Sequence, residues 1–403
     1  MAKKEQVPAI RFQGFADPWE QRKLSDLAEI VGGGTPDTNN SAYWDGDIDW
    51  YAPAEMEGQR YAKGSVRKIT ELGLQKSSAK ILPAHRTVLF TSRAGIGKMA
   101  ILQRPAATNQ GFQSLVLKDG TDPYFIYSMG ERIKGMAEGV ASGSTFLEIS
   151  GKMLGNLEVM VPNLKEQESI ATFFRGIDDL ITLHQRKYDK LVAIKRSMLE
   201  KMFPREGSRF PEIRFAGFTD PWEQRKLNSI AEEITRTDPE STAPVMMITA
   251  NNGFIEQSDR YAFNNAGESL KKYILLEKGE MAYNHGASKL RPYGSCFALT
   301  TAESARIPFV YHCFSVGEND SEFVSMELNG ARVENQLRRI VSSGARMDGL
   351  LNISYEEYSS VKLMMPSVPE QKKLAGYFRQ LDTLITLHQR EESCAASFSN
   401  GCN

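Results

Sequence analysis

The chain has 403 residues, of which 41% are hydrophobic and 25% are charged, with a formal net charge of −1. This composition predicts two or three globular domains, and no apolar run suggests a membrane span or a signal peptide. The four cysteines form no CxxC pair, which gives no zinc or disulfide pattern. We therefore expect reduced thiols and a cytoplasmic location.

Charge is distributed unevenly near the start of the chain. Ser25–Glu57 holds eight acidic residues and no Lys or Arg, whereas Gly58–Arg104 holds one acidic residue, Glu71, and ten basic ones. The basic residues are Arg60, Lys63, Arg67, Lys68, Lys76, Lys80, Arg86, Arg93, Lys98 and Arg104. A stretch of this kind can be an ordinary solvated face, but it also predicts a surface for a polyanion.

Two segments of the chain occur twice. PAIRFQGFADPWEQRKL (Pro8–Leu24) returns as PEIRFAGFTDPWEQRKL (Pro211–Leu227), with 14 of 17 positions identical. PNLKEQESIATFFRGIDDLITLHQR (Pro162–Arg186) matches PSVPEQKKLAGYFRQLDTLITLHQR (Pro366–Arg390), with 14 of 25 identical. The regions between these segments share almost no sequence. This favours a duplicated scaffold that presents two different recognition surfaces, because a duplicated enzyme would more readily keep its catalytic residues in both halves.

The divergent regions have mixed character. We expect a helix over Leu24–Val31, followed by a turn at Gly32–Thr38 in which the glycines adopt positive φ. Ile81–Gln103 predicts two strands, with turns at 83–86 and 92–97, and Tyr273–Gly286 predicts two more. Both regions are therefore predicted to be compact, strand-rich α+β domains.

The second repeated segment predicts long helices. Glu166–Phe203 runs 38 residues without Pro and with Gly176 alone, and its apolar positions step by 4 and 3 as in a coiled coil. The predicted seam contains Ile170, Phe174, Ile177, Ile181 and His184 in the first copy, and Leu374, Phe378, Leu381, Ile385 and His388 in the second. The pattern then fails, so we expect the second helix to end after about residue 390, about four turns short. The two histidines are either tolerated polar residues or a polar layer that sets helix register.

Short motifs give candidate contacts but no catalytic or metal site. Gly95–Lys98 is similar to the end of a phosphate-binding loop, but Ser92 and Met99 stand where Gly and Ser/Thr are required. Such a loop can still contact a phosphodiester or a guanine edge, or be a plain hairpin tip, and amides near strand ends can read adenine or cap turns. Equivalent loops at 142–145 and 342–346 precede the long repeated segments. The predicted DNA-contacting residues are Thr91, Ser92, Arg93, Gly95, Gly97, Lys98, Asn109, Gln110, Ser144, Tyr283, Asn284, Lys289, Arg291, Ser343 and Arg346.

The repeated DPWEQRKL tags, the LITLHQR helices, the GGTP opening and the TSRAGIGK…TNQGF string together resemble the specificity subunit of type I restriction–modification enzymes. The resemblance extends from about Pro8 to Arg390. It implies two target-recognition domains that each read half of a split, asymmetric target in double-stranded DNA, with two antiparallel helices between them. Two methyltransferase and two restriction/translocase subunits would be partners, and S-adenosylmethionine, ATP and Mg²⁺ would belong to them. This chain would be non-catalytic, although the assembled complex would methylate adenine and cleave DNA.

On this resemblance the chain divides into six parts. They are a conserved segment (1–24), a first target-recognition domain (25–161), a central helix (162–209), a repeated segment (210–227), a second target-recognition domain (228–365) and a C-terminal helix (366–403).

Three alternatives remain from the sequence. An enzyme, such as a phosphate-loop NTPase or duplicated hydrolase, would be active alone. A coiled-coil adaptor with two protein-binding modules would lack salt-dependent DNA affinity. A truncated, inactive allele of the specificity subunit would keep the fold without the function.

Overall fold

The computed structural model of the protein describes residues 8–93, 95–142, 147–250, 253–259, 267–341 and 350–401. The chain forms two compact units. Unit 1 comprises Met1–Arg186 and Gln389–Asn403, and unit 2 comprises Lys187–His388. Each unit combines helices with β-sheets, which confirms the predicted α+β class. Among the described helices, none has the length and apolar character that crossing a membrane requires.

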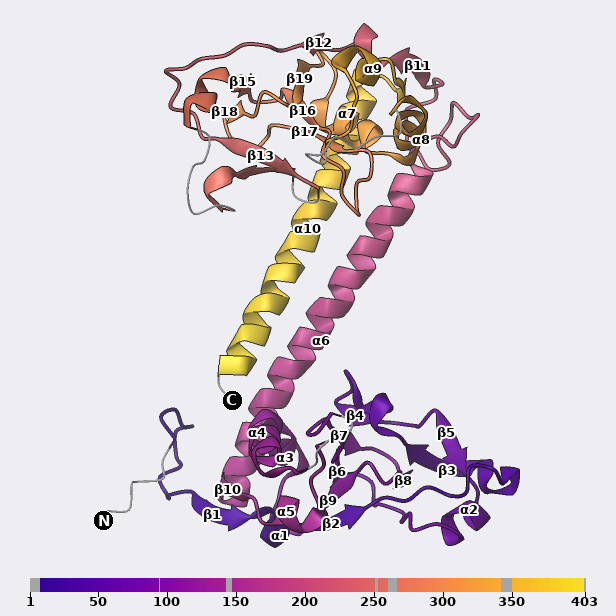
Figure 1. The fold of residues 1–403 in the computed structure, drawn as a ribbon, viewed down its shortest axis with the longest axis vertical. Helices are drawn as coiled ribbons and strands as arrows, with labels where there is room; N and C mark the ends of the chain where they lie inside the picture. The colour runs from indigo at the N-terminus through magenta and orange to yellow at the C-terminus, as the bar shows by residue number, and fades with distance from the viewer. Residues whose placement is uncertain are drawn as a thin grey trace. The chain divides into compact units, whose positions relative to one another are not determined.

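Unit 1 is built on a five-stranded sheet with the order β2-β9-β6-β7-β4 and a three-stranded sheet β5-β3-β8 (Figure 1). Strand β6 reads TVLF because both of its faces are buried: Val88 and Phe90 enter one core and Leu89 enters another. The strands are β2 (Ala28–Gly32), β3 (Trp44–Tyr51), β4 (Tyr61–Ala62), β5 (Arg67–Ile69), β6 (Thr87–Phe90), β7 (Met99–Leu102), β8 (Ala107–Thr108) and β9 (Gln113–Leu117). The helices are α1 (Leu24–Leu27), α2 (Glu71–Gln75), α3 (Pro123–Ser128), α4 (Gly130–Val140) and α5 (Gly151–Gly155).

Unit 2 repeats this strand order without repeating the sequence. Its four-stranded sheet has the order β12-β19-β16-β17, which corresponds to β2-β9-β6-β7 of unit 1. The strands are β12 (Glu232–Glu233), β13 (Met246–Thr249), β14 (Gly253–Glu256), β15 (Ile274–Glu277), β16 (Met281–Asn284), β17 (Ser295–Ala298), β18 (Ser304–Ile307) and β19 (His312–Ser315). The helices are α7 (Ser321–Leu328), α8 (Ala331–Ile340) and α9 (Tyr355–Ser359). The duplication therefore extends through the divergent regions at the level of the fold.

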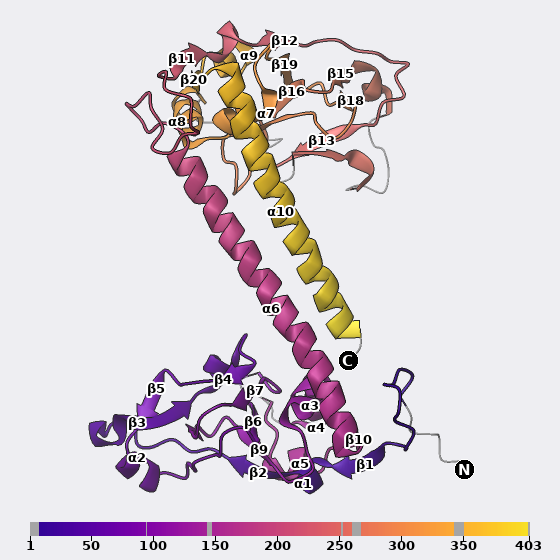
Figure 2. The same ribbon diagram turned by 180° about the vertical axis from the view of Figure 1, so that it is seen from behind.

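The repeated EQRK tetrapeptide forms a strand in both halves. β1 (Glu20–Lys23) pairs antiparallel with β10 (Glu158–Val161), and β11 (Glu223–Lys226) pairs in the same way with β20 (Lys362–Met365). Figure 2 shows each pair beside the start of a long helix, α6 or α10. The first repeated segment is thus tied to the strand that leads into the second.

A buried ion pair fastens the repeated segments together in each half. Arg11 donates from Nε and Nη2 to the two carboxylate oxygens of Glu166, each at 2.7 Å. Arg214 donates to Glu370 through the same atoms at the same distances. Both glutamate side chains are only 1% exposed. Two parallel charge-assisted bonds of this kind hold a fixed geometry.

The adjacent glutamine adds further bonds to what we call the frame, the two repeated segments of each half. Gln167 accepts the backbone N–H of Asp122 at 3.0 Å and donates to the Pro162 carbonyl at 2.9 Å. Gln371 makes the equivalent bonds, to the backbone N–H of Asp320 at 3.0 Å and the carbonyl of Pro366 at 2.9 Å. Both aspartates cap the first helix of the group that follows the sheet. The Glu-Gln dipeptide that both copies share therefore joins each long helix to its insert, the divergent region between the two repeated segments of that half.

The long helices are α6 (Leu164–Lys201, 38 residues) and α10 (Val368–Gly401, 34 residues). The first agrees with the predicted helix to within two residues at each end. The predicted end of the second helix at about residue 390 is wrong, because α10 continues to Gly401. The tail EESCAASFSN contains no Pro or Gly and is rich in Ala, Glu and Ser, so a helix is compatible with it even though the seam pattern has ended.

The predicted seam residues have different surroundings along each helix. Ile170 and Phe174 pack against the core of unit 1, and Leu374, Phe378 and Leu381 belong to the core of unit 2. The later positions Ile177, Ile181, His184, Ile385 and His388 are half-buried. The start of each long helix is therefore part of its own domain.

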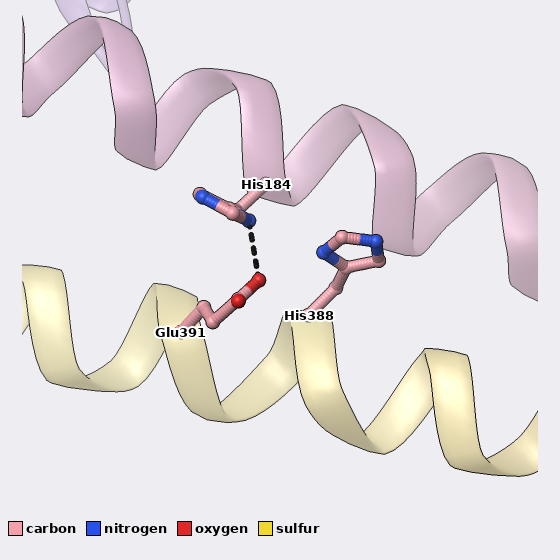
Figure 3. Close-up of side chains that lie close together, drawn as sticks. All are labelled: His184, His388 and Glu391. Atoms are coloured by element: carbon pink, nitrogen blue, oxygen red, sulfur yellow. Dashed lines mark ion pairs between the residues drawn. The ribbon is translucent and has the colours of Figure 1, made fainter.

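Polar contacts join the two helices within each unit. In unit 1, Nδ1 of His184 lies 2.8 Å from Oε2 of Glu391 (Figure 3). In unit 2, Lys195 pairs with Asp382 at 2.5 Å. The His184 contact favours a polar layer over a merely tolerated histidine.

Two local predictions near Gly32 are wrong. The chain forms only one helical turn, α1, and then enters β2, because residues 28–32 pair with β9. The glycines of GGGTP do not adopt positive φ. They permit close packing instead: a Cβ on Gly33 would lie 1.9 Å from the Asn109 carbonyl oxygen, and one on Gly34 would lie 2.4 Å from the Ala79 nitrogen.

Candidate nucleic-acid interface

Loops from separate parts of the first insert meet at one end of the five-stranded sheet. Ser92 donates its backbone N–H to the Gly111 carbonyl at 2.8 Å, and its own carbonyl accepts the N–H of Ile149 at 3.0 Å. Gly34 donates to the carbonyl of Thr108 at 2.9 Å. We call the segments 33–38, 92–97, 109–111 and 147–150 the loop cluster, with Ala94 outside the described residues. It brings together most of the motifs that the sequence singled out in this half.

The glycine-containing loop of this cluster is folded against the core. Thr91 donates from Oγ1 to the Gly95 carbonyl at 2.6 Å and accepts the N–H of Lys98 at 2.9 Å. Ile96 is 6% exposed, and a Cβ on Gly97 would lie 2.4 Å from the Lys134 side chain. The glycines therefore allow a tight, packed turn, since Gly95 and Gly97 both have positive φ.

Burial separates the predicted contact residues of this loop into two groups. Thr91 and Ser92 are fully buried, and so cannot contact DNA through their side chains in this structure. Gly97 is also enclosed. Gly95 is exposed, and Arg93 and Lys98 are partly exposed. The two cations are thus the accessible charged groups of the loop.

The amide turn beside them is used in part to hold the cluster. Asn109 accepts the N–H of Gly111 on its side-chain oxygen at 2.7 Å, which is a turn-capping bond. Gln110 is exposed and accepts a hydrogen bond from Thr35. The structure thus gives Asn109 the capping role that the sequence left open, whereas Gln110 remains accessible.

The basic stretch is partly neutralised by the acidic stretch before it. Lys98 pairs with Glu57 at 3.0 Å, and Lys68 lies 3.6 Å from Asp49. Arg60 pairs with Asp179 of α6. Of the seven other cations Arg93 is partly exposed, and six are exposed: Lys63, Arg67, Lys76, Lys80, Arg86 and Arg104. The net +9 of the sequence therefore overstates the charge that this surface presents.

The corresponding loops of unit 2 have a different chemistry. Tyr283 is 1% exposed, donates to the Tyr293 carbonyl at 2.7 Å and stacks on Tyr358 with ring centroids 3.8 Å apart. The prediction that its side chain contacts DNA directly is therefore wrong for this structure. Asn284 uses both ends of its amide, donating to Ile248 O at 3.1 Å and accepting from Gly286 N at 2.8 Å.

The two predicted cations of unit 2 also differ. Arg291 donates to the Asn329 carbonyl at 2.8 Å, and burial lowers its pKa, whereas Lys289 is exposed. Ser144, Ser343 and Arg346 lie outside the described residues.

One organising residue of unit 2 was not predicted. His285 is 6% exposed, and its ring nitrogens lie 2.9 Å from the Leu351 carbonyl and 2.7 Å from the Val310 carbonyl. Its carbonyl also accepts the N–H of Leu351 at 2.9 Å, as Ser92 accepts that of Ile149 in unit 1. No local pattern around YNHG indicates this role, because both partners are distant in sequence.

Two α+β units with one strand order, joined by repeated segments and bearing different loops, define a duplicated two-domain scaffold. Residues 16–193 match the model of the type I restriction modification DNA specificity domain. The matched residues make up less than half of the chain, which is similar to type I restriction enzyme specificity subunits.

Three relatives and one solved structure are similar to it. The MjaIX specificity subunit of Methanocaldococcus jannaschii is 36% identical over 46% of this chain and 44% of its own length. The EcoR124I/EcoR124II specificity subunit of Escherichia coli is 27% identical over 42% and 46%. Each match thus spans less than half of that relative. A putative MjaX specificity subunit of M. jannaschii is 24% identical over 97% of this chain and 93% of its own.

The crystal structure of a type I restriction-modification S subunit from M. genitalium aligns with a TM-score of 0.54. The alignment covers 99% of this chain and 98% of that one at 14% identity, and so it supports the fold.

Proposed function

We propose that this chain is the DNA-recognition subunit of a cytoplasmic type I restriction–modification complex. Each insert would read one half of a bipartite, asymmetric target in double-stranded DNA. The observation that carries this proposal is the repeated strand order in two units whose corresponding loops differ in sequence and in side-chain chemistry. One frame with two different readers gives an asymmetric target.

We also propose two methyltransferase and two restriction/translocase subunits as partners. Support for paired partners comes from an aromatic pair that the repeated segments form twice. Phe12 and Phe173 meet edge to face at 5.6 Å and are 39% and 41% exposed. Phe215 and Tyr377 repeat this contact at 5.9 Å, and both are half-buried. Two like surfaces suit two copies of one partner.

A shallow hollow lies beside the first aromatic pair. It is lined by Phe12, Lys165, Glu168, Ser169, Thr172 and Phe173. An exposed aromatic surface rimmed by polar groups is typical of a protein interface. In the second half, Lys373 lies over Phe215 at 5.3 Å, so the two surfaces are related but not identical.

The chemistry would belong to the partners. S-adenosylmethionine, ATP and Mg²⁺ would bind to them, and the complex would methylate adenine and cleave DNA. A methyltransferase must extrude its target base from the duplex. This chain would then hold the register of the complex on DNA, through phosphate contacts that position and base contacts that specify.

Exchange of residues 228–365 for the corresponding region of another specificity subunit tests the proposal. The hybrid, co-expressed with the methyltransferase subunit, should keep one half of the wild-type methylation motif and acquire a new second half. A hybrid with the reciprocal exchange of residues 25–161 serves as the matched control. Changes in both halves after either single exchange would contradict two independent readers.

A further inference from the structure

Arg60 joins the edge of the first sheet to the long helix α6. It directly precedes the edge strand β4, and its carbonyl accepts the N–H of Ile101 on the neighbouring strand β7 at 2.9 Å. Its guanidinium donates to Tyr124 Oη at 3.0 Å and to the carboxylate of Asp179. Tyr124 in turn donates to Asp178 at 2.5 Å. Residues 119 positions apart in the sequence are thus connected through one network.

The network is partly enclosed. The Arg60 side chain is 18% exposed and that of Asp178 is 28% exposed, whereas Tyr124 is buried. The guanidinium carbon lies 5.0 Å from the centroid of the Tyr61 ring. Burial lowers the pKa of Arg60, but the hydrogen bonds to Tyr124 and Asp179 outweigh burial and raise it overall. A shared, partly desolvated network holds geometry better than an isolated surface pair does.

The joint extends the contact between the first domain and α6. Ile170 and Phe174 pack against the core of unit 1 near the start of the helix. Asp178 and Asp179 follow Phe174 by four and five residues, which is about 6 to 7.5 Å farther along the axis. Arg60 therefore gives the domain a second point of attachment, and two separated points resist swinging about the helix.

This joint is a property of the first insert and not of the repeated frame. Asp382 corresponds to Asp178 in the repeat, but it pairs with Lys195. Thr383 takes the place of Asp179 and has no carboxylate. In unit 2 an ion pair between Arg379 and Glu322 links α10 to α7 instead. Each insert is thus linked to its long helix by a different ion pair.

We infer that Arg60 is a positioning residue that fixes the first target-recognition domain on α6 and thereby sets how strictly the spacing between the two half-sites is read. The inference rests on the proposed function. A displacement of one base pair along DNA is about 3.4 Å, so a domain held less rigidly on α6 can reach a neighbouring spacing by a small swing. The bases read in each half would not change, because Arg60 is turned towards α6.

The test uses the complex of this chain with its methyltransferase subunit. Adenine methylation by the wild-type complex first defines the two half-sites. A plasmid library then offers them at the native spacing and at one base pair fewer or more. The Arg60→Ala variant should lower the ratio of native to altered spacing by about fivefold or more, with both half-site sequences retained. Arg60→Lys, which keeps the charge, should recover part of that ratio.

Further variants separate positioning from general damage. Asp179→Asn should lower the ratio in the same direction, and adding it to Arg60→Ala should cause little further loss, because both changes break one joint. Arg196→Ala, at an exposed ion pair on the same helix, should leave the ratio unchanged. If Arg60→Ala fails to assemble, Asp179→Asn alone decides, because its side chain is 61% exposed.

Two results would overturn the inference in different ways. Wild-type spacing selectivity in an active Arg60→Ala complex, or in Asp179→Asn where that variant decides, would reject the positioning role and leave the proposed function intact. A wild-type complex that methylates no bipartite motif would reject both.

Discussion

Replacement of Arg214 by Ala should destabilise unit 2, because it leaves the carboxylate of Glu370 buried without its partner. Glu370 is 1% exposed and loses two bonds of 2.7 Å. Removing one member of a buried pair typically costs about 3–5 kcal/mol. Glu370 lies in the first turn of α10, where the helix dipole favours a negative charge by about 0.3–1 kcal/mol. We therefore expect a loss of roughly 3 kcal/mol in the free energy of unfolding.

The first half provides a matched comparison. Trp19 donates from Nε1 to Glu166 at 3.3 Å, whereas Nε1 of the equivalent Trp222 has no partner in the described structure. Glu166 thus keeps one donor when Arg11 is removed, so Arg11→Ala should destabilise unit 1 less than Arg214→Ala destabilises unit 2.

Hydrogen exchange measures the two units separately. Backbone amides of β1 report the opening of unit 1, and those of β11 report the opening of unit 2. The exposed pair Arg196–Glu200 is the control, and Arg196→Ala should cost less than about 0.5 kcal/mol. An Arg214→Ala effect no larger than this control would refute the assignment of a structural role to the buried pair.

Three further predictions concern single sites. Burial raises the pKa of Glu327 to about 7, so the folded state binds the proton more tightly than the unfolded state does. The free energy of unfolding should therefore fall as pH rises from about 4.5 to 7. In urea unfolding, Glu327→Gln should remove this pH dependence and stabilise the protein at pH 8 by up to roughly 3 kcal/mol. Gly33→Ala should destabilise unit 1 by more than about 2 kcal/mol, because the added Cβ would lie 1.9 Å from the Asn109 carbonyl oxygen. The control is Gly135→Ala on α4, where a Cβ would meet no atom within 4 Å; it should be neutral or slightly stabilising in thermal melts. Charge reversal at Arg93 and Lys98 should weaken methylation and flatten the salt dependence of DNA binding while subunit assembly is retained; unchanged methylation would contradict their assignment.

Much of the frame could be predicted from the sequence because its signals are local or repeated. The absence of Pro and the spacing of apolar residues defined α6, and the strand pairs around Thr87–Leu102 followed from short apolar runs between turns. The common strand order of the two inserts could not be seen, since strands with different residues pair through their backbones. The predicted helix over Leu24–Val31 is wrong from Ala28 onward, because the strand β2 there pairs with β9, which lies over 80 residues away.

The candidate interface was predicted less well than the fold. TSRAGIGK and the amide turn were singled out correctly as loops, but the sequence does not show which side chains turn inward. Thr91 closes its own loop, and Tyr283 stacks in a core against Tyr358, although both are residue types that can contact DNA. Exposure depends on tertiary packing, and so do the ion pairs that neutralise Lys98 and Arg60.

The most direct test of the central claim is genome-wide adenine methylation, read by single-molecule sequencing after this chain is co-expressed with its methyltransferase subunit in a methylation-free host. The proposed function predicts one split, asymmetric motif that is absent when either subunit is omitted. A stable complex of the two subunits that methylates no split motif would contradict it and would favour the protein-binding adaptor.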